Sequence, residues 1–230
     1  MESPDRVMAV ELCGERVLLD PQRALIWPAR RTVLIADPHF GKDDVFRRAG
    51  IAVPPGTANA DLARLTALIR AHACERMVVL GDFVHGATQA GDGFLPEFSA
   101  WREAHLGLAV QVIAGNHDRR ERSANWAGSV DWHTTPVVDP PFVFSHEPLP
   151  DARGYVIAGH LHPVYHLARV RRRVRVPVFW QRAGVLVMPS FGSFTGGAPI
   201  RPAPTDSVFA VGPERVIALR RSMPRPEDSP

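Results

Sequence analysis

The chain has 230 residues, of which 45% are hydrophobic and 22% are charged. This balance excludes a disordered or fibrous chain, and the length predicts one sizeable domain. The formal net charge is only +3, although Lys42 is the one lysine among 27 basic residues and the other 26 are arginines. Arginine binds phosphate oxygens in pairs, but codon bias explains such a composition at least as well.

The N-terminal part of the sequence predicts a β-hairpin. Its first thirty residues alternate apolar and polar side chains, with a turn at residues 11–15. No signal peptide precedes this pattern, and no apolar run approaches the roughly 20 residues that cross a bilayer. We therefore expect a cytoplasmic protein without membrane contact.

Five short apolar runs follow, each with the length and composition of a buried strand. They cover residues 32–36, 77–80, 110–113, 142–144 and 155–158. Residues 59–73 and 94–106 have helical patterning. Later strand-like pieces lie at residues 166–176, 178–181, 185–188, 207–211 and 215–219. This order predicts an α/β fold of two packed sheets flanked by helices, with residues 1–222 as a single domain and residues 223–230 as a disordered tail.

A polar cluster follows each of the five runs. The clusters are Asp37-Pro38-His39, Gly81-Asp82-Phe83-Val84-His85, Gly115-Asn116-His117-Asp118, Ser145-His146-Glu147-Pro148 and Gly159-His160-Leu161-His162-Pro163. Because strand ends at one sheet edge bring their loops together, we expect these side chains to meet. Aspartate, asparagine and histidine without cysteine suit Mn²⁺, Fe²⁺ or Zn²⁺ in a catalytic site. The clusters offer at least seven such ligands, which is enough for two metal ions. A carboxylate can bridge two such ions.

The five clusters together resemble the calcineurin-like metallophosphoesterase superfamily, whose signature is D-x-H, G-D, G-N-H-D/E, H and G-H-x-H in that order. The resemblance spans residues 33 to about 192. It implies a four-layer α/β/β/α sandwich with a two-metal site at one edge. It also implies two ligand sets that share a bridging Asp82. The first set is Asp37, His39, Asp82 and His162, and the second is Asp82, Asn116, His146 and His160.

The same resemblance assigns His117 as the histidine that touches the scissile phosphate and protonates the leaving group. A hydroxide held between two metals is available near neutral pH and can attack phosphorus in line. A histidine is a suitable general acid because its ordinary pKa lies near the working pH. Asp118 either orients His117 or caps the following segment.

One departure from the superfamily pattern indicates the type of phosphoesterase. Protein phosphatases of this superfamily carry G-D-x-x-D-R, whereas residues 81–86 here are Gly-Asp-Phe-Val-His-Gly, which argues against that activity. A histidine at position 85 resembles the nucleases of the superfamily, in which it lies near the scissile phosphate. The alternative is that His85 supports a metal ligand from behind.

Residues 37–42 and 46–56, with the clusters at 81–85 and 145–148, resemble the ligase-associated DNA damage response endonuclease family, PdeM. Bacteria encode its members beside an ATP-dependent DNA ligase, an Lhr-type helicase and an exonuclease. The resemblance implies a Mn²⁺-dependent phosphodiesterase that cuts single-stranded DNA internally during DNA repair. Four basic residues near the clusters are candidates for backbone contacts with DNA, or else they form a solvated charged face. They are Lys42, Arg47, Arg48 and Arg119.

Two other functions stay open. A small-substrate phosphodiesterase of the same superfamily, acting on cyclic nucleotides or similar diesters, would need a closed cap over the site. A nuclease would instead need an open groove and salt-dependent binding. A non-catalytic metal-binding scaffold would be expected to have lost a ligand or the catalytic histidine, and this chain has lost neither.

Overall fold

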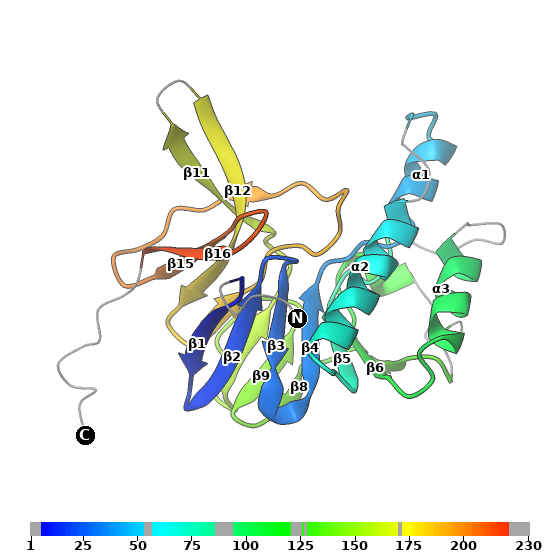
Figure 1. Cartoon of the computed structure of the whole chain (residues 1–230), viewed down its shortest axis with the longest axis horizontal. Coiled ribbons are helices and arrows are strands. Elements are labelled where there is room, and N and C mark those ends of the chain that lie inside the picture. The colour runs from blue at the N-terminus through cyan, green and yellow to red at the C-terminus, as the bar shows by residue number, and fades with distance from the viewer. Residues whose placement is uncertain are drawn as a thin grey trace.

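The computed structural model describes residues 6–52, 57–85, 94–120, 126, 128–169 and 172–220. The tail expected at residues 223–230 lies outside this part. The predicted α/β class is confirmed, because two multi-stranded sheets pack against each other and helices cover one outer face (Figure 1). No described helix is both long enough and apolar enough to span a membrane.

The first sheet has the strand order β1 to β7. Its strands are β1 (Met8–Leu12), β2 (Glu15–Asp20), β3 (Ala24–Trp27), β4 (Thr32–Ala36), β5 (Arg76–Leu80), β6 (Ala109–Ile113) and β7 (Asp131–His133). Strands β1 to β4 are antiparallel neighbours, and β4 to β7 are parallel ones. The predicted N-terminal hairpin is β1–β2, and its two-residue turn holds Cys13 and Gly14 at φ 50° and 79°. A third strand, β3, extends it.

The second sheet has the order β14-β11-β12-β13-β10-β9-β8, with β15 beside β12 and β16 beside β15. Its strands are β8 (Val137–Asp139), β9 (Phe142–Ser145), β10 (Tyr155–Ala158), β11 (Pro163–Arg169), β12 (Arg172–Arg182), β13 (Val185–Val187), β14 (Ala198–Pro199), β15 (Ser207–Val211) and β16 (Val216–Arg220). The single strand predicted over residues 166–176 is wrong. The chain folds back so that Arg169 pairs with Arg172, at a point where the sequence carries no glycine, proline or asparagine.

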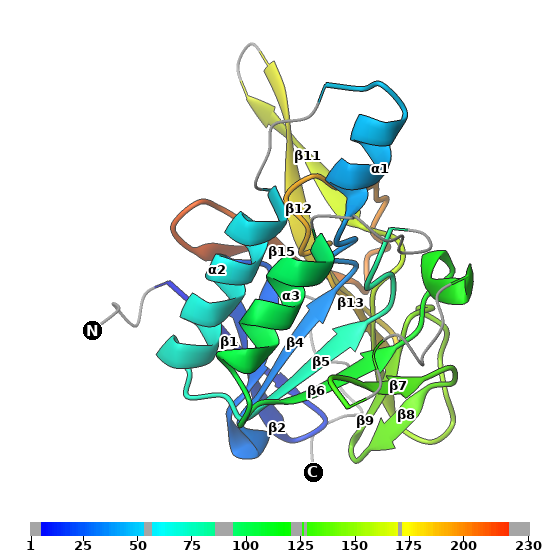
Figure 2. The same cartoon turned by 90° about the vertical axis from the view of Figure 1, so that its right-hand side faces the viewer.

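The described helices are α1 (Lys42–Arg48), α2 (Thr57–Ala71) and α3 (Phe94–Glu103), with short 3-10 turns η1 (Pro28–Arg30) and η2 (His117–Arg120). Helices α2 and α3 lie over the outer face of the first sheet (Figure 2). The described residues include no helix over the outer face of the second sheet, so they form three of the four expected layers. The parallel pair β9 and β10 is joined by a loop, and β10 reaches β13 through the β11–β12 hairpin rather than through a crossover helix.

The strand register brings the polar clusters together. Ala36 pairs with Leu80, and Leu80 pairs with Ile113, so the first three parallel strands of the first sheet end side by side. In the second sheet Ser145 pairs with Ala158. Helix α1 and the β11–β12 hairpin project at the same end of the molecule in both views (Figures 1 and 2). The site is therefore built at the carboxyl ends of strands from both sheets.

Candidate metal centre

The first predicted ligand set converges in the structure. His39 Nε2 lies 3.4 Å from His162 Nε2 and 3.6 Å from Asp82 Oδ2. Asp37 Oδ2 lies 3.5 Å from His162 Nε2. These four residues come from the loops after β4, β5 and β10, and three of them place their ligand atoms within 4.8 Å of one another. The arrangement offers two carboxylates and two imidazoles to one position.

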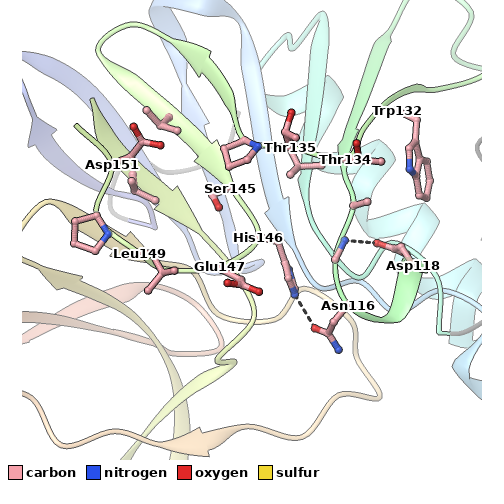
Figure 3. Close-up of a pocket in the computed structure, with 17 residues that line it drawn as sticks. Asn116, Asp118, Trp132, Thr134, Thr135, Ser145, His146, Glu147, Leu149 and Asp151 are labelled. Atoms are coloured by element: carbon pink, nitrogen blue, oxygen red, sulfur yellow. Dashed lines mark hydrogen bonds between the residues drawn. The ribbon is translucent and has the colours of Figure 1, made fainter. Parts of the chain in front are cut away.

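The second predicted ligand set converges beside the first. His146 Nε2 lies 2.9 Å from Asn116 Oδ1 and 3.0 Å from His160 Nδ1, and Figure 3 shows His146 and Asn116 facing each other. Asp82 Oδ1 lies 3.7 Å from His146 Nε2. Because the other oxygen of Asp82 faces His39, this carboxylate lies between the two sets, which is where a bridging ligand has to be.

Five of the seven candidate ligands have left-handed backbone conformations. Asp37, His39, Asp82, His160 and His162 have φ between 44° and 71°. Such conformations are uncommon for non-glycine residues, cost of order 1–3 kcal/mol each, and gather at functional sites. Hydrogen bonds hold them here: His39 N donates to Asp82 O over 2.9 Å, and His160 N donates to the Asp37 carboxylate over 2.9 Å. The fold therefore imposes strain where the ligands leave their strands.

Two glycines leave room for the ligands. A Cβ atom on Gly81 would overlap the His146 ring, and one on Gly115 would overlap the Asp82 carboxylate. Gly81 also has φ +82°, a region that side chains rarely adopt. These two positions admit no side chain while the ligands keep their places.

We expect Gly81→Ala to lower Mn²⁺ affinity by roughly tenfold or more, because the new methyl group displaces His146, and displaced ligands weaken metal binding. Gly184→Ala is the matched control, since Gly184 has φ +71° but nothing within 4 Å of a Cβ. The Gly184→Ala substitution should lower only the free energy of unfolding, by about 1–2 kcal/mol of backbone strain. Calorimetric Mn²⁺ titration and thermal unfolding of both variants separate the two effects. Equal metal affinity in both would contradict the steric argument.

The electrostatics of the centre suit a bound cation. Burial raises the pKa of the fully buried Asp37 carboxyl group. Burial and the neighbouring His162, His85 and Lys42 lower the pKa of His39 to about 2. The His39 ring is therefore neutral and keeps a lone pair for ligation. A fully buried carboxyl group beside the neutral His39 ring is an environment that a divalent cation would stabilise. By their chemistry, the described residues fit a pair of divalent ions.

His117 and His85 form a ring pair beside the first ligand set. Their rings stack at a centroid distance of 4.8 Å and an angle of 24°. His117 is exposed, and its backbone N–H donates to Asp82 Oδ1 over 2.9 Å. His85 Nδ1 lies 3.2 Å from His39 Nδ1, and burial with the charge of Lys42 lowers the pKa of His85 to about 4. His85 thus contacts both a candidate ligand and the candidate acid.

Asp118 makes its described hydrogen bonds with backbone groups rather than with His117. Its carboxylate accepts from the N–H groups of Phe83, Val84 and Gly115 at 2.8 to 3.1 Å. Burial raises the pKa of Asp118 to about 6 in spite of these bonds. The side chain therefore ties the loop after β5 to the loop after β6. The contacts with Phe83 and Val84 span some 35 residues of sequence, so no local sequence signal predicts them.

The basic candidates differ in their surroundings. Lys42 begins α1, and its Nζ lies 5.6 Å from the centre of the Phe46 ring. Arg47 pairs with Asp43 and Asp44 on the same helix, which occupies its charge. Arg48 is exposed at the end of α1. The backbone of Arg119 lies in η2, and its side chain is outside the described part.

A pocket of about 590 Å³ opens beside the second ligand set (Figure 3). Asn116 and His146 form one wall, and Trp132, Thr134 and Leu149 contribute others. This pocket was not predicted from the sequence, because its lining comes from separated loops without a shared motif. Asn116, His117 and His160 are all exposed, so the centre is open to solvent.

Comparison with known proteins identifies related folds and sequences. The family model for calcineurin-like phosphoesterases matches residues 30–209. The solved structure of nuclease MPE from Pseudomonas putida is 38% identical, covers 93% of this chain and 100% of its own, and superposes with a TM-score of 0.81. The phosphoesterase Yfce from E. coli is 16% identical, with a TM-score of 0.43 and coverage of 81% and 96% of the two chains. No curated protein matches.

Proposed function

The chain belongs to the calcineurin-like phosphoesterase family, and from this premise we propose that it is an endonuclease that cleaves single-stranded DNA. The reaction is hydrolysis of a phosphodiester bond at a centre that holds two divalent ions, with Mn²⁺ as the native metal. The enzyme would act in the cytoplasm in DNA repair. By family resemblance its partners are an ATP-dependent DNA ligase, an Lhr-type helicase and an exonuclease.

The observation that carries this proposal is the likeness to the Pseudomonas putida nuclease along almost the whole chain. The centre supports it, since the shared Asp82 lies between two ligand sets. His85 stacks on His117 in the position that the protein phosphatase pattern gives to an aspartate. Both features suit cleavage of a diester by a two-metal site.

The ligand sets would hold the two ions, and these, when bound, would lower the pKa of water and neutralise charge on the phosphoryl oxygens. His117 lies exposed beside the centre, where its imidazolium N–H can donate a proton to the leaving oxygen. His85 contacts His39 and packs on His117, so it fixes the orientation of both rings. Lys42 adds positive charge at the same rim for a phosphate of the DNA backbone.

A small-substrate phosphodiesterase is the second candidate. The open centre favours the nuclease, because His117 and His160 are exposed and no segment among the described residues closes over them. The pocket beside Asn116 and His146 has the volume for a single nucleotide and is the one observation that favours a small diester. The two functions differ in one testable respect: only the endonuclease would cleave a circular DNA strand, which has no ends.

The test uses a covalently closed circle of single-stranded DNA. Incubation with the purified protein and Mn²⁺ should convert the circle to linear pieces, because a circle has no ends and only internal cleavage opens it. Gel electrophoresis measures the conversion. Linear product that depends on Mn²⁺ and on His117 establishes an endonuclease.

EDTA and the His117→Ala variant are the controls for this experiment. An intact circle together with rapid hydrolysis of a cyclic nucleotide in the same tube would reject the nuclease and favour the small-substrate enzyme. Raising the salt concentration should slow cleavage of the circle steeply, since backbone contacts release counterions. Cleavage insensitive to salt would contradict an extended DNA contact.

A further inference from the structure

A row of aromatic rings leads from the two histidines of the centre to the protein surface. Phe46 meets His85 edge-on at 6.2 Å between ring centres, and Phe194 meets Phe46 edge-on at 5.5 Å. Phe194, Lys42 and the ligand candidate His39 also line one small hollow. Phe194 therefore lies at the rim of the centre, although none of the five polar clusters in the sequence includes it.

Phe194 stands outside the core, unlike its neighbour in the same loop. Phe191 is fully buried under α2, whereas Phe194 is 39% exposed. Phe194 is also the one aromatic residue among the exposed large hydrophobic side chains of the described chain. Exposing an aromatic ring to water forgoes the free energy of its burial. Such exposure is informative when the ring lies beside a reactive centre.

The loop that carries Phe194 is firmly tied to the body. Asp61 on α2 accepts a hydrogen bond from Ser193 N over 3.0 Å. Arg64 on the same helix donates to the Phe191 carbonyl oxygen and stacks over the Phe191 ring at 3.9 Å. The loop also contacts the metal centre directly, since Gly196 O lies 3.2 Å from His162 Nδ1. The Phe194 ring is thus presented on a rigid support, which lowers the entropy cost of stacking on it.

We propose that Phe194 is a stacking platform for an unpaired nucleobase next to the scissile phosphate. This inference rests on the nuclease function proposed above. Lys42 at the rim supplies positive charge for the backbone, and the exposed ring supplies a face for the base, which is the combination that proteins use to bind single strands. The platform selects single strands, because bases in a duplex are already stacked and paired and present no free face.

The test measures kcat/KM of Phe194→Ala on a single-stranded oligonucleotide and on an oligonucleotide of equal length with every base replaced by tetrahydrofuran. Stacking of one base on an aromatic residue is worth about 1–3 kcal/mol, so truncation should lower kcat/KM roughly 5- to 150-fold on the natural strand. The abasic strand should be cut equally slowly by both proteins. Phe194→Trp should retain the wild-type rate, and Phe194→Leu, which keeps apolar packing, should behave like Phe194→Ala.

Ile217→Ala is the matched control, because Ile217 is 48% exposed on β16 and its truncation should leave both rates unchanged. A wild-type rate for Phe194→Ala on the natural strand would overturn the platform. An equal loss on the abasic strand would also overturn it, since that result means a displaced loop rather than lost stacking. If the wild-type protein cuts neither strand yet hydrolyses a cyclic nucleotide, the nuclease function itself fails, and the platform fails with it.

Discussion

Asp82→Asn is expected to abolish tight binding of the metal pair and to reduce phosphodiesterase activity by more than roughly 100-fold. The two oxygens of Asp82 face different ligand sets, at 3.6 Å from His39 Nε2 and 3.7 Å from His146 Nε2. An asparagine has the same shape but is neutral and keeps a single oxygen, so it cannot serve both sets. Changes to groups that only support metal ligands already cost about 10- to 100-fold, and loss of a bridging carboxylate should exceed that range.

The measurement is metal content after loading with Mn²⁺ and dialysis, together with kcat for a diester substrate. The amide oxygen of the introduced asparagine would still accept the hydrogen bond that His117 N donates to Asp82 Oδ1. The loops should therefore keep their fold, and thermal unfolding of the metal-free protein checks this. Glu147→Gln is the control for charge alone, because Glu147 is exposed and lines the neighbouring pocket. If Asp82→Asn still holds two Mn²⁺ ions tightly, the proposed bridging role of Asp82 is wrong.

The candidate centre was largely predictable from the sequence because its chemistry follows strand order. Asp37, Asp82, Asn116, His146 and His160 each lie directly after a short buried run, and parallel strands in register end at one edge. Local sequence therefore determined which side chains meet. The two packed sheets were predictable for the same reason, since residues 33–36 of β4 and 77–80 of β5 are apolar and are buried on both faces.

Other features depend on contacts between distant segments and have no local signal. Phe194 and Phe191 belong to one short stretch of sequence, and nothing in it says that only Phe191 is buried. Asp118 follows the candidate acid His117 but binds the backbone of a loop some 35 residues away. Arg169 pairs with Arg172 inside a run, residues 169–175, whose alternating arginine and valine resemble a single strand. In each case tertiary packing decided the outcome, which composition and spacing do not encode.

His117→Ala is expected to retain both metal ions and to cut DNA about 10²- to 10⁴-fold more slowly than the wild type. His117 is exposed, and its ring meets the ring of His39 edge-on at 5.0 Å between centres, within a group of three histidines that also includes His85. It belongs to neither of the two ligand sets that share Asp82, so those sets stay complete when its side chain is removed. Its proposed work is to protonate the leaving oxygen. The same variant should therefore hydrolyse a p-nitrophenyl ester of a nucleotide at close to the wild-type rate, because p-nitrophenolate leaves without a proton.

The ratio of the two rates separates acid catalysis from damage to the centre. A lost general acid slows only the substrate with the poor leaving group, whereas a displaced ligand slows both. His85→Ala gives the contrast, since His85 Nδ1 contacts the ring of His39 at 3.2 Å. Its removal should weaken metal binding and slow both substrates if His85 acts as a support. If His117→Ala cuts DNA at the wild-type rate, another group must protonate the leaving oxygen. His85, which stacks on His117, would then be the first candidate.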